Sequence, residues 1–526
     1  MNERAEHIKK LMDENSAFRR YSFYKGFLIT DAELNAIGDY PFYDNYWTDY
    51  KLGAYTLRVH NEIKLTTFDG KSGQWFIIGH AYNPFTMEYE ELDLLKSIDS
   101  ASDKLDVLNS FTGVFVIGCI NGNDIKFSLD ASGMLWTCHA LIDNKLYISS
   151  HVRMLGDLFN LSEDKYAKRL ISYKYYNYML GNYLPGDITI LEGVKHLAPN
   201  LLLNYVDSNL SVTRFYPCRA LDMANSDDEY NQVIDDAAKI FSNTLKLISL
   251  KFKEPYISLT GGRDSNVTFA AANGVYDKFK AFNYVSMERE KADMEAAVKI
   301  ASNFNVPISV FDVPDTNDKV ENFDEFKAII EHLDGEIGTF KDSDIRKKIT
   351  MKNSNVNLEV KSWIGETVRA YGYKYFGLKK MPKKLKPRHW SCMFKIFLGK
   401  RKLLHDTDKH FADYIKKTEL KEKLFNYDES DFFVWEMMHG YKCGLNIGEM
   451  KLCFDITIPY NNRKLIDLLL RVPLNDRIND RLMIDLVRKL NPDLSALNIY
   501  VKNLNETDRR ARMLKRYFKI NSHLPY

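Results

Sequence analysis

The chain has 526 residues, of which 45% are hydrophobic and 27% charged, and its formal net charge is +2. These values are typical of a soluble globular protein with two to four domains, and so balanced a charge argues against a nucleic-acid or membrane partner. The sequence shows no basic and apolar leader and no uncharged apolar run long enough to cross a bilayer, so we expect a cytoplasmic protein.

Six cysteines are scattered along the chain, and none forms a C-x-x-C pair. This pattern argues against a structural zinc site and against a disulfide scaffold. We therefore expect reduced thiols, most of them buried. They are Cys119, Cys138, Cys218, Cys392, Cys443 and Cys453.

Residues 1–41 are charged and helical in pattern, so we predict an N-terminal helical extension there. Residues 42–220 are rich in short strands. The clearest is the apolar run 113–120, which the turn Asn121-Gly-Asn-Asp124 joins to a second strand. Asn-Gly between apolar runs favours a tight hairpin, because both residues tolerate positive φ. The segment predicts an antiparallel meander with helices packed on one face, such as 89–97 and 163–179.

The pattern changes around Ser226. Ser226 and Glu229 have the spacing of a capping box, which predicts the start of a helix. After this helix, strands alternate with helices, an order that predicts a parallel, doubly wound sheet. We place a domain boundary near residue 220, with a second domain at 221–526. The strands are predicted at 255–259, 279–285 and 308–313, and the helices at 264–273 and 291–304.

The sharpest motif is Ser258-Leu-Thr-Gly-Gly-Arg-Asp-Ser265, between a predicted strand and a predicted helix. A turn there directs backbone N–H groups and the positive end of the helix dipole at one point. Gly261 and Gly262 let the backbone approach a phosphate, and the hydroxyls of Thr260 and Ser265 add donors. Asp264 would repel phosphate directly, so its natural role is to hold a Mg²⁺ that bridges phosphate oxygens. The alternative is an ordinary Gly-Gly turn with Ser and Asp caps.

This motif resembles the S-G-G-x-D-S signature of the PP-loop ATP pyrophosphatases, with Thr260 in place of the first Ser. The resemblance implies that the loop, including Ser258 and Leu259, binds ATP through its pyrophosphate part. A substrate carboxylate then attacks the α-phosphate, and an acyl-adenylate and pyrophosphate result. The resemblance also implies that Phe282 and Asn283, at the end of the next predicted strand, lie near the adenine. For Phe282, core packing is the alternative.

Within that superfamily the chain resembles the asparagine synthetases, because similar segments follow one another in the same order. Residues 128–133 resemble the D-x-x-G segment of the amidotransferase-type domain, and 181–204 the stretch that closes it. Residues 293–301 resemble the D-x(n)-A-x-x-x-A helix, and 458–473 the C-terminal P-F-x-D segment. The resemblance implies an α/β fold class, with an N-terminal Ntn-hydrolase-like αββα sandwich (42–220) and a C-terminal doubly wound parallel sheet of the PP-loop type.

Two family motifs are altered in this chain. Where the family has G-x-G-x-D-E, residues 363–369 retain only Gly365 and Glu366. The resemblance gives Gly365 a place at the nucleotide and Glu366 a role in holding Mg²⁺ with Asp264; a surface glutamate is the alternative. Where the family has a catalytic lysine near the pyrophosphate, the nearest equivalent is Arg481, which can neutralise phosphate charge but cannot exchange a proton near neutral pH.

Glutamine-hydrolysing members of the family use an N-terminal cysteine as the nucleophile. This sequence begins Met1-Asn2-Glu3 and has no cysteine before Cys119, so we expect a domain that keeps its fold and has lost glutaminase activity. β-Lactam synthetases and lasso-peptide cyclases resemble this arrangement, in which a substrate supplies the amine.

The sequence therefore predicts an ATP- and Mg²⁺-dependent carbon–nitrogen ligase that adenylates a small-molecule or peptide carboxylate. The amine or ammonia donor is not identified, and a homodimer is left open. Two alternatives remain: a pseudoenzyme with a binding or regulatory role, and an ammonia-using enzyme that amidates a sugar acid in surface-polysaccharide assembly. The basic segment 379–402, interleaved with Trp390, Phe394 and Phe397, is either a docking site for a polyanion or a solvated face.

Overall fold

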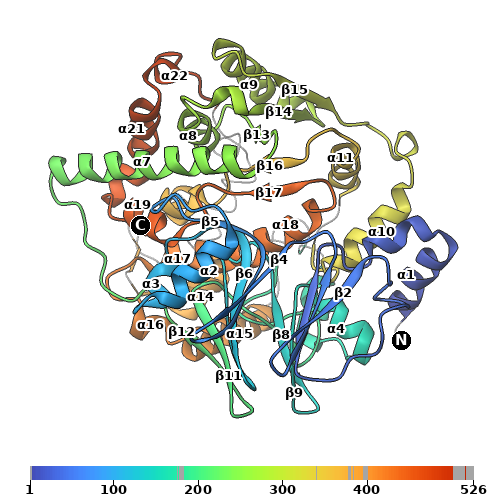
Figure 1. The fold of residues 1–526 in the computed structure, drawn as a ribbon. Helices are drawn as coiled ribbons and strands as arrows, with labels where there is room; N and C mark the ends of the chain where they lie inside the picture. The colour runs from blue at the N-terminus through green and yellow to red at the C-terminus, as the bar shows by residue number, and fades with distance from the viewer. Residues whose placement is uncertain are drawn as a thin grey trace.

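The computed structural model describes residues 3–173, 176, 183–338, 341–376, 381–382, 384–394, 401–501 and 516. Two antiparallel sheets lie in the lower half of Figure 1, and a parallel sheet formed by later residues lies above them. The predicted fold class, an antiparallel sandwich followed by a parallel α/β sheet, is confirmed.

The first antiparallel sheet has the strand order β10-β8-β9-β1-β3-β2. In its interior, Ile29 of β1 lies beside Leu57 of β3 on one side and beside Ile148 of β9 on the other. The strands are β1 (Phe27–Thr30), β2 (Trp47–Leu52), β3 (Tyr55–His60), β8 (Cys138–Ile142), β9 (Lys145–Ser149) and β10 (Lys195–His196).

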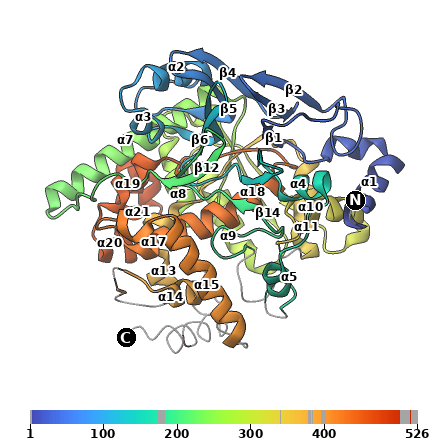
Figure 2. The same ribbon diagram turned by 90° about the horizontal axis from the view of Figure 1, so that it is seen from below.

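The position of β1 corrects the prediction that residues 1–41 form a helical extension. Only α1 (Glu3–Glu14) and the 3-10 helix η1 (Ser16–Tyr21) are helical there, whereas β1 is a buried inner strand of the first sheet. Phe18 of η1 packs edge-on against Phe326 of the helix α10 (Phe323–Leu333), with ring centres 5.5 Å apart. Figure 2 shows this N-terminal segment beside α10. The extension is therefore part of the folded molecule.

The second antiparallel sheet has the order β12-β11-β7-β6-β5-β4. The predicted hairpin joins β6 and β7, with Asn121 paired to Asp124 across the turn. The predicted helix 89–97 corresponds to α2 (Glu91–Ser100), whose Leu94 and Leu95 pack in one apolar cluster with Ile77 and Phe115 of the sheet. The strands are β4 (Leu65–Gly70), β5 (Gly73–Tyr82), β6 (Thr112–Asn121), β7 (Asp124–Leu129), β11 (Leu201–Val206) and β12 (Asn209–Arg214).

The parallel sheet has the order β15-β14-β13-β16-β17, so β13 is its central strand. Ile257 of β13 lies beside Ala281 of β14 and beside Val360 of β16. The helix α7 (Asp227–Lys251) precedes the sheet and begins at the predicted cap, where Ser226 Oγ accepts a hydrogen bond from the Glu229 backbone N–H at 3.2 Å. The strands and their first helices are β13 (Tyr256–Ser258), α8 (Arg263–Ala271), β14 (Lys280–Val285), α9 (Lys291–Asn303), β15 (Ile308–Asp312), β16 (Leu358–Val360) and β17 (Asp455–Thr457).

The other helices complete the layers around the sheets. Of the predicted helix 163–179, α5 forms the first part, and residues 174, 175 and 177–179 lie outside the described residues. These helices are α3 (Lys104–Leu108), α4 (Val152–Phe159), α5 (Lys165–Ile171), α11 (Asp342–Lys352), α12 (Gly365–Val368), α13 (Tyr371–Phe376), α14 (Pro387–Met393), α15 (Arg401–Lys417), α16 (Leu420–Lys423), α17 (Glu429–Phe433), the π-helix η5 (Val434–Cys443), α18 (Gly444–Met450), α19 (Arg463–Leu470), α20 (Leu474–Ile478), α21 (Arg481–Leu490) and α22 (Pro492–Ala496); short 3-10 turns lie at Tyr276–Lys278, Glu288–Glu290 and Asn317–Lys319.

The antiparallel and parallel parts share one continuous apolar core. Polar contacts also join them: the Tyr82 hydroxyl and Thr457 Oγ1 lie 2.9 Å apart, and Asn461 Nδ2 donates to Asp130 Oδ1 at 2.8 Å. The predicted boundary near residue 220 lies between the end of β12 and the start of α7. The division into domains stays a prediction. No helix in the described part of the chain is both long and apolar enough to span a bilayer.

Two other sequence expectations change in the folded molecule. In the basic segment 379–402, Trp390 and Phe394 are buried, and the Trp390 indole N–H donates to Glu429 Oε1 at 2.7 Å. These aromatic residues therefore belong to the core and are not a docking surface, and Phe397 lies outside the described residues. All six cysteines are free, but only Cys138 and Cys392 are fully buried, and Cys218 is exposed.

Candidate functional site

The Gly-Gly loop lies at the carboxyl end of the central strand β13 and leads directly into α8. The strand is apolar and buried, and the helix buries Val267, Phe269 and Ala270, so the two elements fix the loop between them. The first helical hydrogen bond of α8 runs from the Asn266 N–H to the Gly262 carbonyl. The N–H groups of residues 263–265 come before that bond and therefore have no partner within the helix. Helix N-termini commonly bind anions through such groups.

The loop hydroxyls and the N–H groups of Thr260, Gly261 and Gly262 bond within the protein. Thr260 Oγ1 and Ser265 Oγ lie 2.9 Å apart, and the Gly262 N–H donates to Thr260 Oγ1 at 3.1 Å. The Gly261 N–H donates to Asp293 Oδ1 of α9 at 3.1 Å. Thr260 and Ser265 therefore set the shape of the loop, and the first turn of α8 offers the N–H groups for an anion.

The segment 499–501 covers the loop. The Val501 N–H donates to the Gly261 carbonyl at 3.0 Å, and Asn266 Nδ2 donates to the Ile499 carbonyl at 3.2 Å. A methyl group added at Gly261 would lie 2.3 Å from a Val501 side-chain carbon. Glycine at this position thus permits the close approach of the covering segment.

Asp264 projects from the first turn of α8 into a charged cluster. Its Oδ2 accepts a hydrogen bond from Arg369 Nη1 at 2.6 Å, and its Oδ1 is buried with no donor among the described residues. Burial raises the pKa of Asp264 to about 6; Arg369 works against this rise and the charge of Glu366 adds to it. A Cβ on Gly365 would lie 2.2 Å from Asp264 Oδ1, so only glycine leaves room for the carboxylate.

Glu366, in α12, is the second acidic residue of the cluster. Its Oε2 is buried and has no hydrogen-bond donor in the described part of the chain. His439 Nε2 is 3.8 Å away, and burial lowers the pKa of His439 to about 3, so the histidine is neutral and beyond hydrogen-bond reach. Two carboxylate oxygens, one from Asp264 and one from Glu366, are therefore available for a cation.

Arg369 and Lys374 bring positive charge to this cluster. Arg369 Nε donates to Asp480 Oδ1 at 2.9 Å, and Lys374 forms an ion pair with the same oxygen. Burial opposes ionisation of Asp480, but these two cations outweigh it and lower its pKa. Sequence reasoning gave neither cation a role, although Arg369 ends the motif that contains Glu366. The position of Arg369 in that motif was the sequence signal that could have identified it as part of the site.

Arg481 does not join the cluster. Its guanidinium lies 4.1 Å from the ring centre of Tyr230 on α7 and forms ion pairs with Asp476 and Asp485. Asp480, the residue before it, has a left-handed backbone with φ 59°. Asp480 reaches Arg369 while the Arg481 side chain contacts α7, so the structure brings Arg369 and Lys374 to the loop in place of the predicted arginine.

The remaining predicted residues lie at the sheet edge beside the loop. Asn283 Nδ2 donates to the Leu259 carbonyl at 2.6 Å and so holds the start of the loop. Ser258 Oγ donates to the Val360 carbonyl at 3.4 Å. Phe282 is almost fully buried against Tyr256, Phe311 and Phe454, which agrees with core packing, and it also lines a small cavity.

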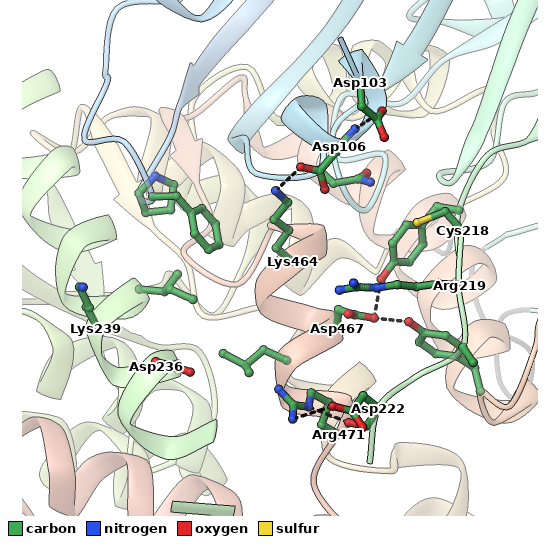
Figure 3. Close-up of a pocket in the computed structure, with 18 of the residues that line it drawn as sticks. Asp103, Asp106, Cys218, Arg219, Asp222, Asp236, Lys239, Lys464, Asp467 and Arg471 are labelled. Atoms are coloured by element: carbon green, nitrogen blue, oxygen red, sulfur yellow. Dashed lines mark hydrogen bonds and ion pairs between the residues drawn. The ribbon is translucent and has the colours of Figure 1, made fainter. Parts of the chain in front are cut away.

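A cavity of about 900 Å³ lies elsewhere, between α7, α19 and the linker that follows β12 (Figure 3). Several of its charged residues pair with one another across or beside it: Lys464 with Asp106 at 2.9 Å, and Arg471 with Asp222 at 3.2 Å. Asp467 accepts a hydrogen bond from the Tyr216 hydroxyl at 2.8 Å. These polar groups are satisfied internally, so size alone does not make this cavity the site.

Strand β1, an inner strand of the first antiparallel sheet, is preceded by the buried Lys25 and by Gly26. Lys25 Nζ lies 2.6 Å from Asp455 Oδ1 of β17, and the lysine side chain is 8% exposed. Cys138, in the same sheet, has its pKa raised by burial, which favours the unreactive thiol. Lys25, two residues before this inner strand, therefore forms an ion pair with the parallel sheet.

Fold and site together define an α/β protein in which a helix N-terminus and a buried acidic cluster lie at the carboxyl end of a parallel sheet. Neither a family model nor a curated protein matches the chain. Among solved structures it is similar to glutamine phosphoribosylpyrophosphate amidotransferase from B. subtilis complexed with ADP and GMP, at 8% identity and a TM-score of 0.22, over 57% of this chain and 63% of that chain.

A second similar structure is described as the allosteric regulatory enzyme of purine biosynthesis, at 9% identity and a TM-score of 0.24, over 64% of this chain and 91% of that one. A third is the glutamine-dependent NAD+ synthetase from Acinetobacter baumannii in complex with ADP, at 13% identity and a TM-score of 0.17, over 36% of this chain and 38% of that one. At such low TM-scores these similarities carry no argument about what the chain binds or does.

Proposed function

We propose that this protein is an ATP-dependent carbon–nitrogen ligase that adenylates a substrate carboxylate and then forms an amide. The observation that carries the proposal is the acidic cluster at the loop: Asp264 and Glu366 each keep one buried carboxylate oxygen without a donor among the described residues. A buried, unsatisfied carboxylate oxygen is costly. Its presence at an anion-binding helix N-terminus is the pattern expected of a site for a metal–phosphate group.

Magnesium fits this arrangement. Mg²⁺ in nucleotide sites is commonly bound by one or two carboxylates, with phosphate oxygens and water completing its ligands. Asp264 and Glu366 would hold it, and it would neutralise phosphate charge and orient the phosphates. No larger group of acidic, histidine or cysteine ligands occurs in the described ranges, which agrees with a metal held partly by the nucleotide.

The residues of the cluster would divide the work between them. The first turn of α8 would bind phosphate oxygens, and Arg369 and Lys374 would stabilise the charge of the departing pyrophosphate. The substrate carboxylate attacks the α-phosphorus, and the bond to the bridging oxygen of the β-phosphate breaks. An amine then attacks the acyl carbon, AMP leaves with the electrons of the C–O bond, and the protons lost by the nitrogen pass to solvent.

The amine would come from a source other than glutamine hydrolysed by this chain. Lys25, two residues before the inner strand β1, has its ammonium paired with Asp455. This ion pair supports a structural role for the antiparallel sandwich. The amine donor is therefore a separate substrate or free ammonia.

Exchange of labelled pyrophosphate into ATP tests the adenylation step. We expect exchange that depends on one carboxylate from a panel of amino acids, peptides and sugar acids, and that falls at least 100-fold in Asp264→Asn. Asp318→Asn is the matched control, since Asp318 is exposed on a distant turn. Exchange that survives in Asp264→Asn would overturn the assigned role of the loop.

A pseudoenzyme is the second candidate, and one observation favours it. Arg369 already neutralises Asp264, and the segment 499–501 covers the loop. In a pseudoenzyme these contacts would be permanent. A melting temperature that MgATP leaves unchanged, together with no pyrophosphate exchange across the panel, would favour this candidate over the ligase.

A further inference from the structure

A second, smaller cavity opens at the same edge of the parallel sheet as the loop. It has a volume of about 220 Å³ and lies between β14, β16, α11 and α18. Phe282, one of its lining residues, is paired with Ser258 at the end of β13. Ligands of open α/β sheets bind beyond the carboxyl ends of the strands, so this cavity is placed to serve the reaction at the loop.

Glu359 of β16 lines this cavity with an incomplete set of hydrogen bonds. The residue is 1% exposed. Its Oε1 accepts from Lys361 Nζ at 2.9 Å, whereas its Oε2 is buried and no donor reaches it from the described residues. Leaving a buried carboxylate oxygen without a donor costs free energy. A bound molecule with an N–H group would remove that cost.

Three other charged groups of the cavity, Lys347, Lys348 and Glu449, already have partners. Lys348 Nζ lies 2.5 Å from Glu449 Oε2, and the Lys347 ammonium lies 4.1 Å from the ring centre of Tyr284. The lining has three acidic and three basic side chains, Asp344, Glu359 and Glu449 with Lys347, Lys348 and Lys361. So balanced a lining does not select a polyphosphate, and the volume is below that of a typical drug-sized site.

Four aromatic side chains line the cavity beside its charged groups. Phe282, Tyr284, Trp363 and Phe454 all line it. Flat apolar walls beside one buried acceptor favour a compact ligand with an apolar or ring-shaped body and one N–H donor. A nucleotide sugar is both too large and too strongly charged for this space.

We propose that this cavity binds the amine substrate of the ligase, a compact primary amine whose nitrogen donates to Glu359 Oε2. The assignment rests on the proposed function for its role in the reaction. It places the amine beside the edge at which the acyl-adenylate would form, and it gives Glu359 the part of a binding and positioning residue. It narrows the amine donor to small molecules and excludes peptidyl or nucleotide-linked amines.

Calorimetric titration of the full chain with phenethylamine, putrescine and 3-phenylpropionate tests this assignment. We expect phenethylamine to bind and the matched carboxylate not to bind. Glu359→Gln, which keeps the shape of the side chain and removes its charge, should weaken phenethylamine at least 10-fold. The exposed Glu288→Gln is the control and should bind as the parent chain does. Equal binding by Glu359→Gln would overturn the proposal.

Three further measurements separate the outcomes. Trp363→Leu should weaken phenethylamine more than putrescine, and it keeps the test open if Glu359→Gln does not fold. Displacement of phenethylamine by adenosine would assign the cavity to the nucleotide and overturn the amine site. Asp264→Asn should abolish pyrophosphate exchange and leave amine binding intact. If the parent chain itself showed no exchange, the ligase proposal would be wrong. Amine binding and its loss in Glu359→Gln would still test the amine site separately.

Discussion

Asp264 is subject to opposing electrostatic effects. Burial and the nearby Glu366 disfavour its ionised form, whereas the Arg369 guanidinium at 2.6 Å favours it, and the balance is a pKa of about 6. The raised pKa means that the ionised Asp264 carboxylate is destabilised in the folded protein. A bound cation would stabilise it. Catalytic and binding sites are where such conflicts concentrate.

The sign of the resulting pH dependence follows from linkage. In the unfolded chain the Asp264 carboxyl titrates near 3.8, and in the folded chain it titrates near 6. Between these values the folded protein holds a proton that the unfolded chain releases, so stability falls as pH rises through this window. The free energy of unfolding of Asp264→Asn, taken relative to that of the parent chain, should therefore rise by on the order of 1–2 kcal/mol between pH 3.5 and pH 7.5.

Urea unfolding at pH 3.5 and 7.5 measures this gain, with Asp318→Asn as the exposed control. MgATP binding should show the opposite trend. It needs the ionised carboxylate, so it should increase as pH rises through about 6 and be lost in Asp264→Asn. A stability difference between variant and parent chain that is the same at pH 3.5 and pH 7.5 would contradict the raised pKa.

At the scale of single elements, the short helix α12 controls the geometry of the site. It begins at Gly365, directly after Ile364, whose φ of 79° turns the chain out of β16. This turn places Gly365 against Asp264 and directs Glu366 and Arg369 toward the loop. The distances at Asp264 are therefore set by a turn of the backbone as well as by side-chain packing.

Gly365→Ala should disrupt this contact. Its Cβ would lie 2.2 Å from Asp264 Oδ1 and 2.8 Å from Asp264 Cγ, so the carboxyl would have to rotate away from Arg369. We expect MgATP affinity to fall at least 10-fold and stability to fall by about 1–2 kcal/mol. Nucleotide titration and urea unfolding measure the two effects.

Gly448→Ala provides the matched comparison for that variant. Gly448 lies within α18, and a methyl group there would meet no heavy atom within 4 Å. Alanine is a better helix former, so this variant should be more stable by up to about 1 kcal/mol. If both variants bound MgATP equally well, the close approach of Gly365 to Asp264 would have no functional meaning.

Elements with a strong local pattern could be predicted from the sequence, and contacts between distant segments could not. The unit β13–α8 was predicted because an apolar strand, two glycines and a helix start are contiguous. Strand β1 was missed because it has only three apolar residues, 27–29, which stand close to Arg and Lys in a segment of helical character.

The same reasoning explains the errors at the site. Asp264 and Arg369 are 105 residues apart, and nothing in either local pattern shows that they pair. Arg481 was placed by spacing along the chain, but its direction depends on the left-handed backbone of Asp480, which turns the side chain toward Tyr230. A motif identifies the residues near a loop, and the three-dimensional fold decides which cation reaches it.

At the scale of the whole molecule, one fully buried ion pair joins the sandwich to the helical part. Arg214, at the end of β12, donates through Nη1 and Nη2 to Glu436 of η5 at 2.5 and 3.0 Å, and neither side chain is exposed. Glu436 also accepts hydrogen bonds from the Tyr414 hydroxyl at 2.6 Å and from Asn200 Nδ2 at 3.2 Å. Donors from three separate segments therefore depend on the carboxylate of a fourth.

Arg214→Met should be strongly destabilising for this reason. It leaves the Glu436 carboxylate buried without its cation, which typically costs about 3–5 kcal/mol, and urea unfolding at pH 7 measures the loss. Lys319→Met, which breaks the exposed i,i+4 pair with Asp315, should cost less than about 0.5 kcal/mol.

The double variant Arg214→Met/Glu436→Met separates the two sources of that loss. With both charges gone, no unpaired ion remains in the core, so much of the stability should return, because apolar replacement of a buried pair is often nearly neutral. If the double variant were as unstable as Arg214→Met alone, the cost would lie in lost packing and in the orphaned Tyr414 and Asn200. The ion pair would then specify how β12 and η5 meet, and the packing around it would supply the stability that joins the two parts of the molecule.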